Sequence, residues 1–416
     1  MTTTKRALQV GWRLQGTSAL RRLGYEVDIL IDGGTWDWYA HPGWPGESET
    51  LLFTQDFNSS EHLAFTLNRL ARTGPAYDAV VGFDEYALMP AWQAASMLGR
   101  PGPDWRIVAN MRDKSAQKGI LGEGGITCAR WWLIDDIRRQ RDEVLALSDQ
   151  LPLVLKPYSG AATVDTFVAR SVPQLRDAAE RLAASSSRMV MAETYIAGTE
   201  HHADGVVHEG SIGTFSLGEY QGNLIQIGEG MTPASIAVSP AAAPQEYQEA
   251  RELISRALSL LGLRNGVFHA ELFLTASGWV FSEVAMRVGG GGISLHHQVM
   301  CDLDLHESMV RAQVGLPPQP SDGVAQAASP VTGWTFLPGP PGIVRNFPPR
   351  EEILKQEGVL DVEINTRLGQ KLGPSTADTF TRVATAVISA PTRTEFIDRQ
   401  QSLVEWFRPQ VIVDSD

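Results

Sequence analysis

The sequence contains little of what marks several common classes of protein. It has only two cysteines in 416 residues, Cys128 and Cys301, so it cannot form a disulfide framework, and no C-x-x-C pair indicates zinc. It has no run of about 18 apolar residues that could span a bilayer. Its first ten residues lack the apolar stretch of a signal peptide. We therefore expect a cytoplasmic protein that does not bind a membrane.

Positive charge is also scarce. Lysine and arginine together number 35 against 48 acidic residues, which gives a formal net charge of −13. A protein that binds nucleic acid or an anionic membrane needs a surplus of cations, so we expect small molecules as partners and no nucleic acid. Only six of the cations are lysines, at positions 5, 114, 118, 156, 355 and 371. Because lysine and arginine differ as ligands for anions, each of these few lysines is a candidate functional residue.

Several familiar catalytic and binding motifs are absent. The chain has no G-x-G-x-x-G after its first strand-like segment, no G-x-x-x-x-G-K-[ST] and no H-E-x-x-H. Ser159 lacks a G-x-S-x-G setting, which argues against a serine hydrolase. The pairs His201-His202 and His296-His297 do not have the spacing of a catalytic zinc site.

A chain of this length is expected to divide into two or more domains. Strand-like and helix-like segments alternate over residues 5–100, which predicts a parallel α/β domain. We expect this domain at 1–105, a lid subdomain with connecting helices at 106–218, a larger subdomain at 219–316 and an α+β region at 317–416. For the oligomeric state, a homodimer is the default expectation.

The segment VLKPYSGAAT is the first of four features that suggest phosphate chemistry. A buried-type strand leads to Lys156 and then to a loop of small residues, of which Ser159, Gly160, Ala161 and Thr163 are candidate ligands. Small residues let backbone N–H groups approach an anion, and the lysine adds a positive charge beside them. The alternative is an ordinary lysine at the edge of a domain.

The second feature is Arg112-Asp113-Lys114, followed by Lys118 one helical turn later. Residues four apart lie on one face of a helix, so the two lysines should point the same way. A solvated helix face is the alternative interpretation.

The third feature is the segment AETYIAGTEHHADG. Glu193, Tyr195 and Ile196 precede a glycine that permits a turn, and Glu200 follows it. Such a linker can hold the edge of an adenine, and a carboxylate after the turn can accept hydrogen bonds from a ribose. An edge strand with surface glutamates would show the same pattern.

The fourth feature, HAELFLTASGWVFSEVAMRVGGGG, is the most specific. In a hairpin Glu271 and Glu283 can point to the same side, because residues alternate between the faces of a strand. Two adjacent carboxylates repel unless a divalent cation neutralises them. Arg287 adds a cation that faces a glycine loop, and phosphoryl transfer uses this combination. A structural hairpin with exposed glutamates is the alternative.

Taken in order, these motifs resemble the ATP-grasp superfamily, and within it the carboxylate–amine ligases of the L-amino-acid ligase type. The motifs are RDK, V-x-K-P, E-x-Y-I-x-G-x-E, H-x-E and E-V-x-x-R-x-G-G, and they extend over most of the chain. The resemblance implies a Rossmann-like pre-ATP-grasp domain, followed by two α+β subdomains that hold ATP between two sheets. It also implies an ADP-forming ligase that joins a carboxylate to an amine.

The resemblance assigns roles to individual residues. Lys114 and Lys156 would contact ATP phosphates, and the loop at 159–163 would close over them. The segment from Glu193 to Ile196 would hold adenine, and Glu200 the ribose. Glu271 and Glu283 would bind Mg²⁺ or Mn²⁺. Among the residues expected at the substrate are Arg287, Gly290, Gly291 and His296, and we expect Lys156, Glu283 and Arg287 to be catalytic.

One position departs from the motif of many ATP-grasp enzymes. Their E-x-N-x-R has asparagine as a further metal ligand, whereas this chain has Ala285. A water would have to take that coordination position. The departure keeps open a nucleotide-binding homologue without catalysis. A second alternative keeps the fold and changes the acceptor, namely an ATP-grasp ligase that acts on a purine-pathway-like or other small carboxylate.

Overall fold

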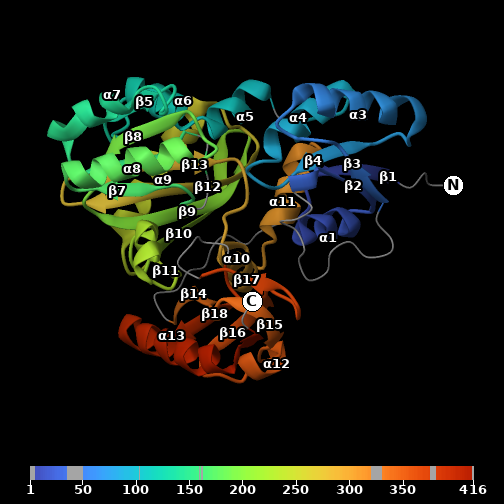
Figure 1. Ribbon diagram of the computed structural model, residues 1–416. Coiled ribbons are helices and arrows are strands. Elements are labelled where there is room, and N and C mark those ends of the chain that lie inside the picture. Colours follow the sequence, from blue (N-terminus) through green and yellow to red (C-terminus); the bar gives the residue numbers. More distant parts are fainter. Residues whose placement is uncertain are drawn as a thin grey trace.

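The computed structural model describes residues 5–34, 50–102, 104–158, 160, 163–319, 330–374 and 381–414. Three bodies are visible in Figure 1: an N-terminal body, a central body around the longest strands and a C-terminal body. The N-terminal body has a parallel sheet in the order β3-β2-β1-β4. Its elements are β1 (Lys5–Val10), α1 (Leu14–Arg22), β2 (Tyr25–Ile31), β3 (Thr50–Phe53), α3 (Ser60–Thr73), β4 (Ala79–Gly82) and α4 (Leu88–Met97). The parallel α/β arrangement predicted for this region is confirmed, while the boundary at residue 105 stays a prediction.

Two helices connect this body to the next. They are α5 (Trp105–Arg112) and α6 (Lys114–Glu123), and the side chain of Asp113 caps α6 by accepting from the backbone N–H groups of Ser115 and Ala116. An acceptor at this position satisfies N–H groups that have no partner in the first turn. The cap fixes where α6 begins and therefore where Lys114 lies.

The lid sheet is antiparallel, in the order β5-β8-β6-β7. The elements of the lid are β5 (Trp131–Ile134), α7 (Arg141–Leu145), η1 (Ala146–Gln150), β6 (Leu153–Pro157), β7 (Phe167–Ala169), α8 (Val172–Ala184) and β8 (Val190–Thr194). The apolar side of the sheet packs against helix α8 through Leu155, Leu175 and Leu182, all of them fully buried. The opposite side is therefore left to face the central body.

The largest sheet has eight strands, in the order β13-β12-β9-β10-β11-β14-β18-β16. Its strands are β9 (Thr199–His208), β10 (Ser211–Tyr220), β11 (Ala234–Ala237), β12 (Gly266–Thr275), β13 (Gly278–Ala285), β14 (Val331–Leu337), β16 (Val359–Ile364) and β18 (Ala384–Ala390). The two-residue turn at Glu209-Gly210, with φ of 51° and 83°, joins β9 to β10.

The remaining elements surround this sheet or follow it. They are η2 (Leu224–Glu229), α9 (Pro244–Leu261), α10 (Ile293–Cys301), α11 (Leu305–Gln313), α12 (Arg350–Ile353), α13 (Arg393–Phe407), η3 (Arg408–Gln410) and the small sheet of β15 (Gly342–Asn346), β17 (Lys371–Leu372) and β19 (Ile412–Asp414). None of the helices in the described ranges combines the length and apolarity of a membrane-spanning segment.

The sheet order differs from the division expected at residue 218. Strands β9 and β10 pair with β12 and with each other in the eight-stranded sheet, so the lid sheet ends at β8. Strands β14, β16 and β18 of the C-terminal region continue the same sheet. Strand pairing is a long-range property that local composition does not specify, and for this reason the sequence placed the boundary too late.

Candidate active site

The candidate site lies where α6 and the lid sheet face β12 and β13. Helix α6 buries Lys114, Gln117, Lys118 and Leu121, which occupy one face at helical spacing. Gln117 fixes this face to β13, because its Nε2 donates to Val284 O at 2.8 Å and its Oε1 accepts from Val284 N at 3.0 Å. The alternative of a solvated face for the two lysines is therefore wrong.

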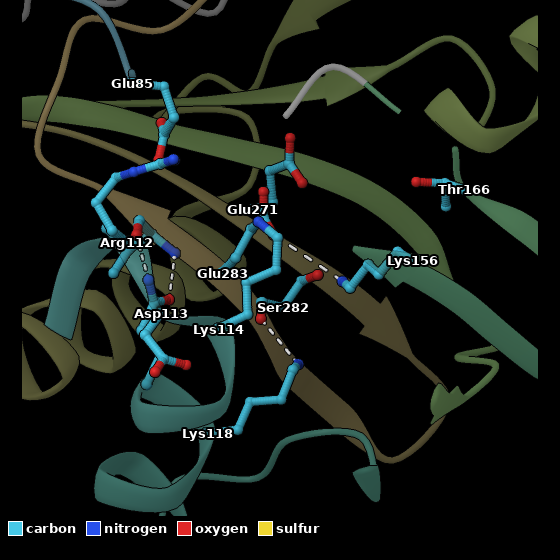
Figure 2. A network of polar contacts seen from close by, with 12 residues as sticks. Glu85, Arg112, Asp113, Lys114, Lys118, Lys156, Thr166, Glu271, Ser282 and Glu283 are labelled. Carbon is cyan, nitrogen blue, oxygen red and sulfur yellow. Dashed lines mark hydrogen bonds and ion pairs between the residues drawn. The ribbon is translucent and has the colours of Figure 1, made fainter. Parts of the chain in front are cut away.

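Three lysines lie close to Glu193 and Glu283. Figure 2 shows Lys114, Lys118 and Lys156 together with Glu283. The Lys114 ammonium pairs with Glu283, and the Lys156 ammonium, from β6, lies 3.9 Å from the same carboxylate and 3.1 Å from Glu193 Oε1. The Lys118 ammonium donates to Ser282 O at 2.9 Å and lies 3.5 Å from Glu193. These pairs bring residues from α6, the lid sheet and β13 into one charged cluster.

The electrostatics of this cluster follow from burial and pairing. Burial disfavours the charged forms, but the lysines hold the pKa of Glu193 below its usual value and that of Glu283 at about 2. Burial likewise opposes the charge on Lys156, but Glu193 and Glu283 raise its pKa above the usual lysine value, so it is charged at all ordinary pH values. Burial lowers the pKa of Lys118 in spite of Glu193.

Glu271 and Glu283 are direct partners in the register of β12 and β13. Register partners in an antiparallel pair lie on the same face, with Cβ atoms about 5 Å apart. Both side chains keep partial exposure, 21% for Glu271 and 26% for Glu283. A β-bulge follows Glu271 in this pairing, and it re-aims the strand next to the two carboxylates.

Arg287 is held by a carboxylate from the N-terminal body. Its Nε donates to Glu85 Oε2 at 2.5 Å and its Nη1 donates to Val288 O at 3.0 Å. The other oxygen of Glu85 accepts from Arg112 Nη1 at 2.6 Å. The two guanidinium groups keep the pKa of Glu85 below its usual value although burial opposes this. Glu85 follows β4 at the carboxyl ends of the parallel strands, which is where α/β sheets bind ligands.

Several groups of the segment expected to hold adenine have partners within the protein. The carboxylate of Glu193 is occupied by the two lysines, and the backbone N–H of Tyr195 donates to Pro152 O at 2.9 Å. The Arg170 guanidinium lies over the Tyr195 ring at 4.7 Å. The Glu193 carboxylate and the Tyr195 N–H thus have partners within the protein, Ile196 is half-buried, and adenine binding by this segment stays a prediction.

Glu200 is buried beside Glu271 and η2. Its Oε2 accepts from Leu224 N at 2.6 Å, and its own N–H donates to Asn223 Oδ1 at 3.0 Å. Burial and the nearby Glu271 carboxylate raise the pKa of Glu200 to about 8. A neutral carboxyl group here can both donate and accept hydrogen bonds, which suits a ribose.

The glycines of the loop after β13 differ in how much space surrounds them. A Cβ on Gly290 would meet nothing within 4 Å, whereas one on Gly291 would lie 2.8 Å from the Trp334 ring. His296 is buried beside this loop, and its expected contact with substrate stays a prediction. It is 6% exposed and its Nε2 lies 3.1 Å from Thr332 Oγ1, and burial lowers its pKa to about 3.

The lid loop is only partly described. Ser159 and Ala161 of this loop lie outside the described residues. Trp36, Trp38 and Trp44, in the N-terminal part of the chain, also lie outside them. Gly160 donates its backbone N–H to Pro157 O at 3.4 Å. Thr163 has a φ of 61°, a left-handed conformation that a β-branched residue rarely adopts.

Sequence reasoning missed several residues of the site. Glu85 is the second of two acidic residues that follow the apolar run AVVGF, and its place after the end of a parallel strand was the available signal. Asp204 and His269 lie within the quoted segments but were given no role of their own, and in the structure they hydrogen-bond to each other at 2.8 Å. Within the described residues no group of three or more His, Cys, Asp and Glu side chains is arranged as a metal site.

Comparisons with known proteins identify the fold. Residues 149–295 match the family described as the ATP-grasp domain. Over 323 residues the chain is 25% identical to an L-arginine-specific L-amino acid ligase of Bacillus subtilis, which covers 75% of each chain. Over 146 residues it is 27% identical to the dapdiamide A synthase of Enterobacter agglomerans, which covers 34% of each.

Solved structures agree with this identification. The crystal structure of an L-amino acid ligase from Bacillus licheniformis superposes with a TM-score of 0.76, at 17% identity and with all of both chains covered. An N5-carboxyaminoimidazole synthase from Aspergillus clavatus, bound to ADP and a ribonucleotide, gives a TM-score of 0.68 at 19% identity over 97% of this chain and 99% of that one. The likeness establishes an ATP-grasp fold over the whole chain.

Proposed function

We propose that this ATP-grasp enzyme is an ADP-forming carboxylate–amine ligase, which joins an amino acid or another small carboxylate to an amine through an acyl phosphate. The observation that carries the proposal is the cluster of Lys114, Lys156 and Glu283 between the lid sheet and β13, with Arg287 beyond it. The cluster combines cations for phosphates with carboxylates for a divalent cation. The likeness of the chain to an L-amino acid ligase and to dapdiamide A synthase supports the reaction class.

The carboxylates fit Mg²⁺ or Mn²⁺. Mg²⁺ is held in proteins by one or two carboxylates together with substrate phosphates, and it keeps several waters. Glu271 and Glu283 are register partners on one face and remain partly exposed, which suits such a site. Ala285 adds no ligand. When bound, the cation would neutralise charge on the phosphates during transfer.

The lysines and the lid bind and enclose the nucleotide in this proposal. Lys114 and Lys156 would contact the phosphates, while Glu193 holds Lys156 and is itself paired with Lys118. A carboxylate substrate attacks the terminal phosphoryl group, and this converts a poor leaving group into phosphate. The loop at 158–163 would exclude water, because an acyl phosphate is hydrolysed if water enters.

Arg287 would act on the reacting carbonyl. Glu85 and the Val288 carbonyl occupy Nε and Nη1, so they fix the plane of the guanidinium group. Nη2 is the donor that this arrangement leaves for the acyl phosphate and for the oxyanion formed when the amine attacks. A single well-placed donor of this kind is worth about 2.7–4 kcal/mol in other enzymes.

A second ligase activity has support from the fold alone. The synthases that carboxylate an aminoimidazole share the fold, with TM-scores of 0.68 and 0.67. An acceptor of that kind would use the same ATP chemistry with bicarbonate in place of an amino acid. A cytoplasmic location and a homodimer remain predictions.

The test is to incubate the protein with ATP, Mg²⁺ and pooled amino acids while phosphate release and product masses are followed together. We expect phosphate release together with a new mass equal to two substrates minus one water. Phosphate release with bicarbonate and an aminoimidazole, but with no amino acid, would favour the second activity. Nucleotide binding without phosphate release from any pool would contradict a ligase.

A further inference from the structure

A buried polar network lies directly beneath the carboxylate of Glu271. Asp204 is fully buried on β9, and its two oxygens lie 2.6 Å from His202 Nδ1 and 2.8 Å from His269 Nδ1. His202 Nε2 lies 2.7 Å from Ser235 Oγ, on β11. A buried carboxylate needs such partners, because removing an unpaired charge from water is very unfavourable.

The register explains how the network reaches the site. His269 is the partner of Asp204 across β12 and β9, and Glu271 is two residues further along β12, so the His269 and Glu271 side chains share one face. An ionised carboxylate only accepts hydrogen bonds, so Nδ1 of His269 carries a proton and donates a hydrogen bond to Asp204. Nε2 is then the atom presented to Glu271, at 3.7 Å from Oε1.

The glycine loop closes this network from above. A Cβ on Gly289 would lie 2.6 Å from Asp204 Oδ1 and 2.9 Å from His269 Nδ1. Both distances are too short for a real contact, so only glycine lets the loop cover the pair. The ring of His269 is thus confined by Asp204 on one side and by the loop backbone on another.

We propose that Asp204 and His269 are positioning residues for the divalent cation: Asp204 fixes the imidazole ring, and the ring orients the carboxylate of Glu271. Groups of this kind, which hold a metal ligand from behind, typically change metal affinity by about 10- to 100-fold when they are removed. The proposal rests on the assignment of Glu271 as a ligand in the proposed function. It concerns cation affinity and does not depend on which substrates are joined.

Two variants of His269 separate positioning from simple packing. His269→Asn places an amide nitrogen near Nδ1, so it keeps the contact with Asp204 and loses the one with Glu271. His269→Gln places an amide nitrogen near Nε2, so it keeps the contact with Glu271. We expect His269→Asn and Asp204→Asn to weaken Mn²⁺ binding about tenfold or more, and His269→Gln to restore most of the affinity.

The measurement is Mn²⁺ titration of the full chain with saturating ADP, followed by electron paramagnetic resonance of free Mn²⁺. The matched control is His297→Gln, because His297 is also buried and bonded, with Nε2 2.6 Å from Ser216 Oγ, but has no contact with Glu271. The control should bind Mn²⁺ like the wild type. The affinity for ADP at saturating Mn²⁺ should stay within about twofold in every variant.

Each other outcome has a defined meaning. Equal affinity in His269→Asn, His269→Gln and the wild type would overturn the positioning role while leaving the metal site intact. A loss in His297→Gln as large as that in His269→Asn would also overturn it, because any buried histidine would then suffice. A wild-type protein that binds no Mn²⁺ would overturn the metal site and this proposal together. Mn²⁺ binding without product from any amino acid would count against the proposed function alone.

Discussion

Replacement of Glu283 by glutamine should abolish turnover while leaving the protein folded. Glutamine keeps the shape and one hydrogen-bond acceptor but removes the charge that Lys114 and Lys156 face. It also removes a candidate ligand of the divalent cation. We expect phosphate release to fall at least about a thousandfold, because charge neutralisation by a metal is worth several kcal/mol in a transition state.

The expected effect on stability is smaller, because two contributions oppose each other. The Coulomb attraction between Glu283 and Lys156, at 3.9 Å, is about 4 kcal/mol at an effective dielectric constant near 20. The variant also loses the repulsion between Glu283 and its register partner Glu271, and this loss stabilises the folded protein. Lys156 keeps Glu193 at 3.1 Å. Lys114 loses its ion-pair partner Glu283, and removal of one member of a buried pair costs about 3–5 kcal/mol. The lost repulsion reduces this cost, so we expect the free energy of unfolding to fall by about 2–4 kcal/mol.

Both quantities can be measured on the same protein. Phosphate release is followed with ATP and a substrate pool, and thermal unfolding is followed by circular dichroism with and without Mg²⁺ and ADP. Ligand binding raises the melting temperature of the wild type, and the variant should lose the Mg²⁺-dependent part of this rise. Turnover within tenfold of the wild type would refute the assignment of Glu283.

A matched control removes a buried carboxylate elsewhere. Asp28 accepts from Arg6 at 2.8 and 2.9 Å and from the Tyr77 hydroxyl at 2.7 Å, all within the N-terminal body. Asp28→Asn should destabilise the protein by a similar or larger amount. Its turnover per folded molecule should remain that of the wild type, which separates loss of stability from loss of chemistry.

The remaining predictions concern the lysine cluster, the histidines, the glycine loop and the metal. Lys118→Met should raise the KM for ATP several-fold in steady-state assays, because Glu193 would then be paired with Lys156 alone. Burial lowers the pKa of His297 to about 4. The contribution of the neutral imidazole to stability is therefore present above pH 6.5 and is lost as the pH falls toward 4. The melting temperature of His297→Gln should depend less on pH over that range than that of the wild type. Gly289→Ala should lower the melting temperature by several degrees and Gly290→Ala should not, since only the former Cβ meets other atoms. EDTA should stop phosphate release, and either Mg²⁺ or Mn²⁺ should restore it.

Local patterns in the sequence were sufficient for much of the fold and part of the site. The spacing of Lys114 and Lys118 predicted a shared helix face, and both lie on the buried face of α6. The alternation along the hairpin predicted a common side for Glu271 and Glu283, and the register makes them direct partners. These features depend only on residues close together in the chain, so short-range periodicity determines them.

Features that depend on distant segments could not be predicted in this way. Glu85 and Arg287 are separated by 202 positions, and only the packing of the N-terminal body against the end of β13 brings them together. Besides β10, the partner of β9 is β12, in which His269 lies opposite Asp204 and 65 positions after it, so composition alone placed β9 in the wrong sheet. The burial of His296 is a third example, because it depends on Thr332, 36 positions away, whose hydroxyl group lies 3.1 Å from the imidazole.

The charges of the site explain how it can be stable before a nucleotide binds. Lys114, Lys156 and Arg287 have carboxylate partners in Glu283, Glu193 and Glu85, so these cations are neutralised within the protein itself. In the proposed function each part of the incoming complex has a matching group, phosphates for the lysines and a divalent cation for Glu271 and Glu283. Binding would then exchange partners without burying unpaired charge, which is the arrangement that the high cost of isolated buried ions requires.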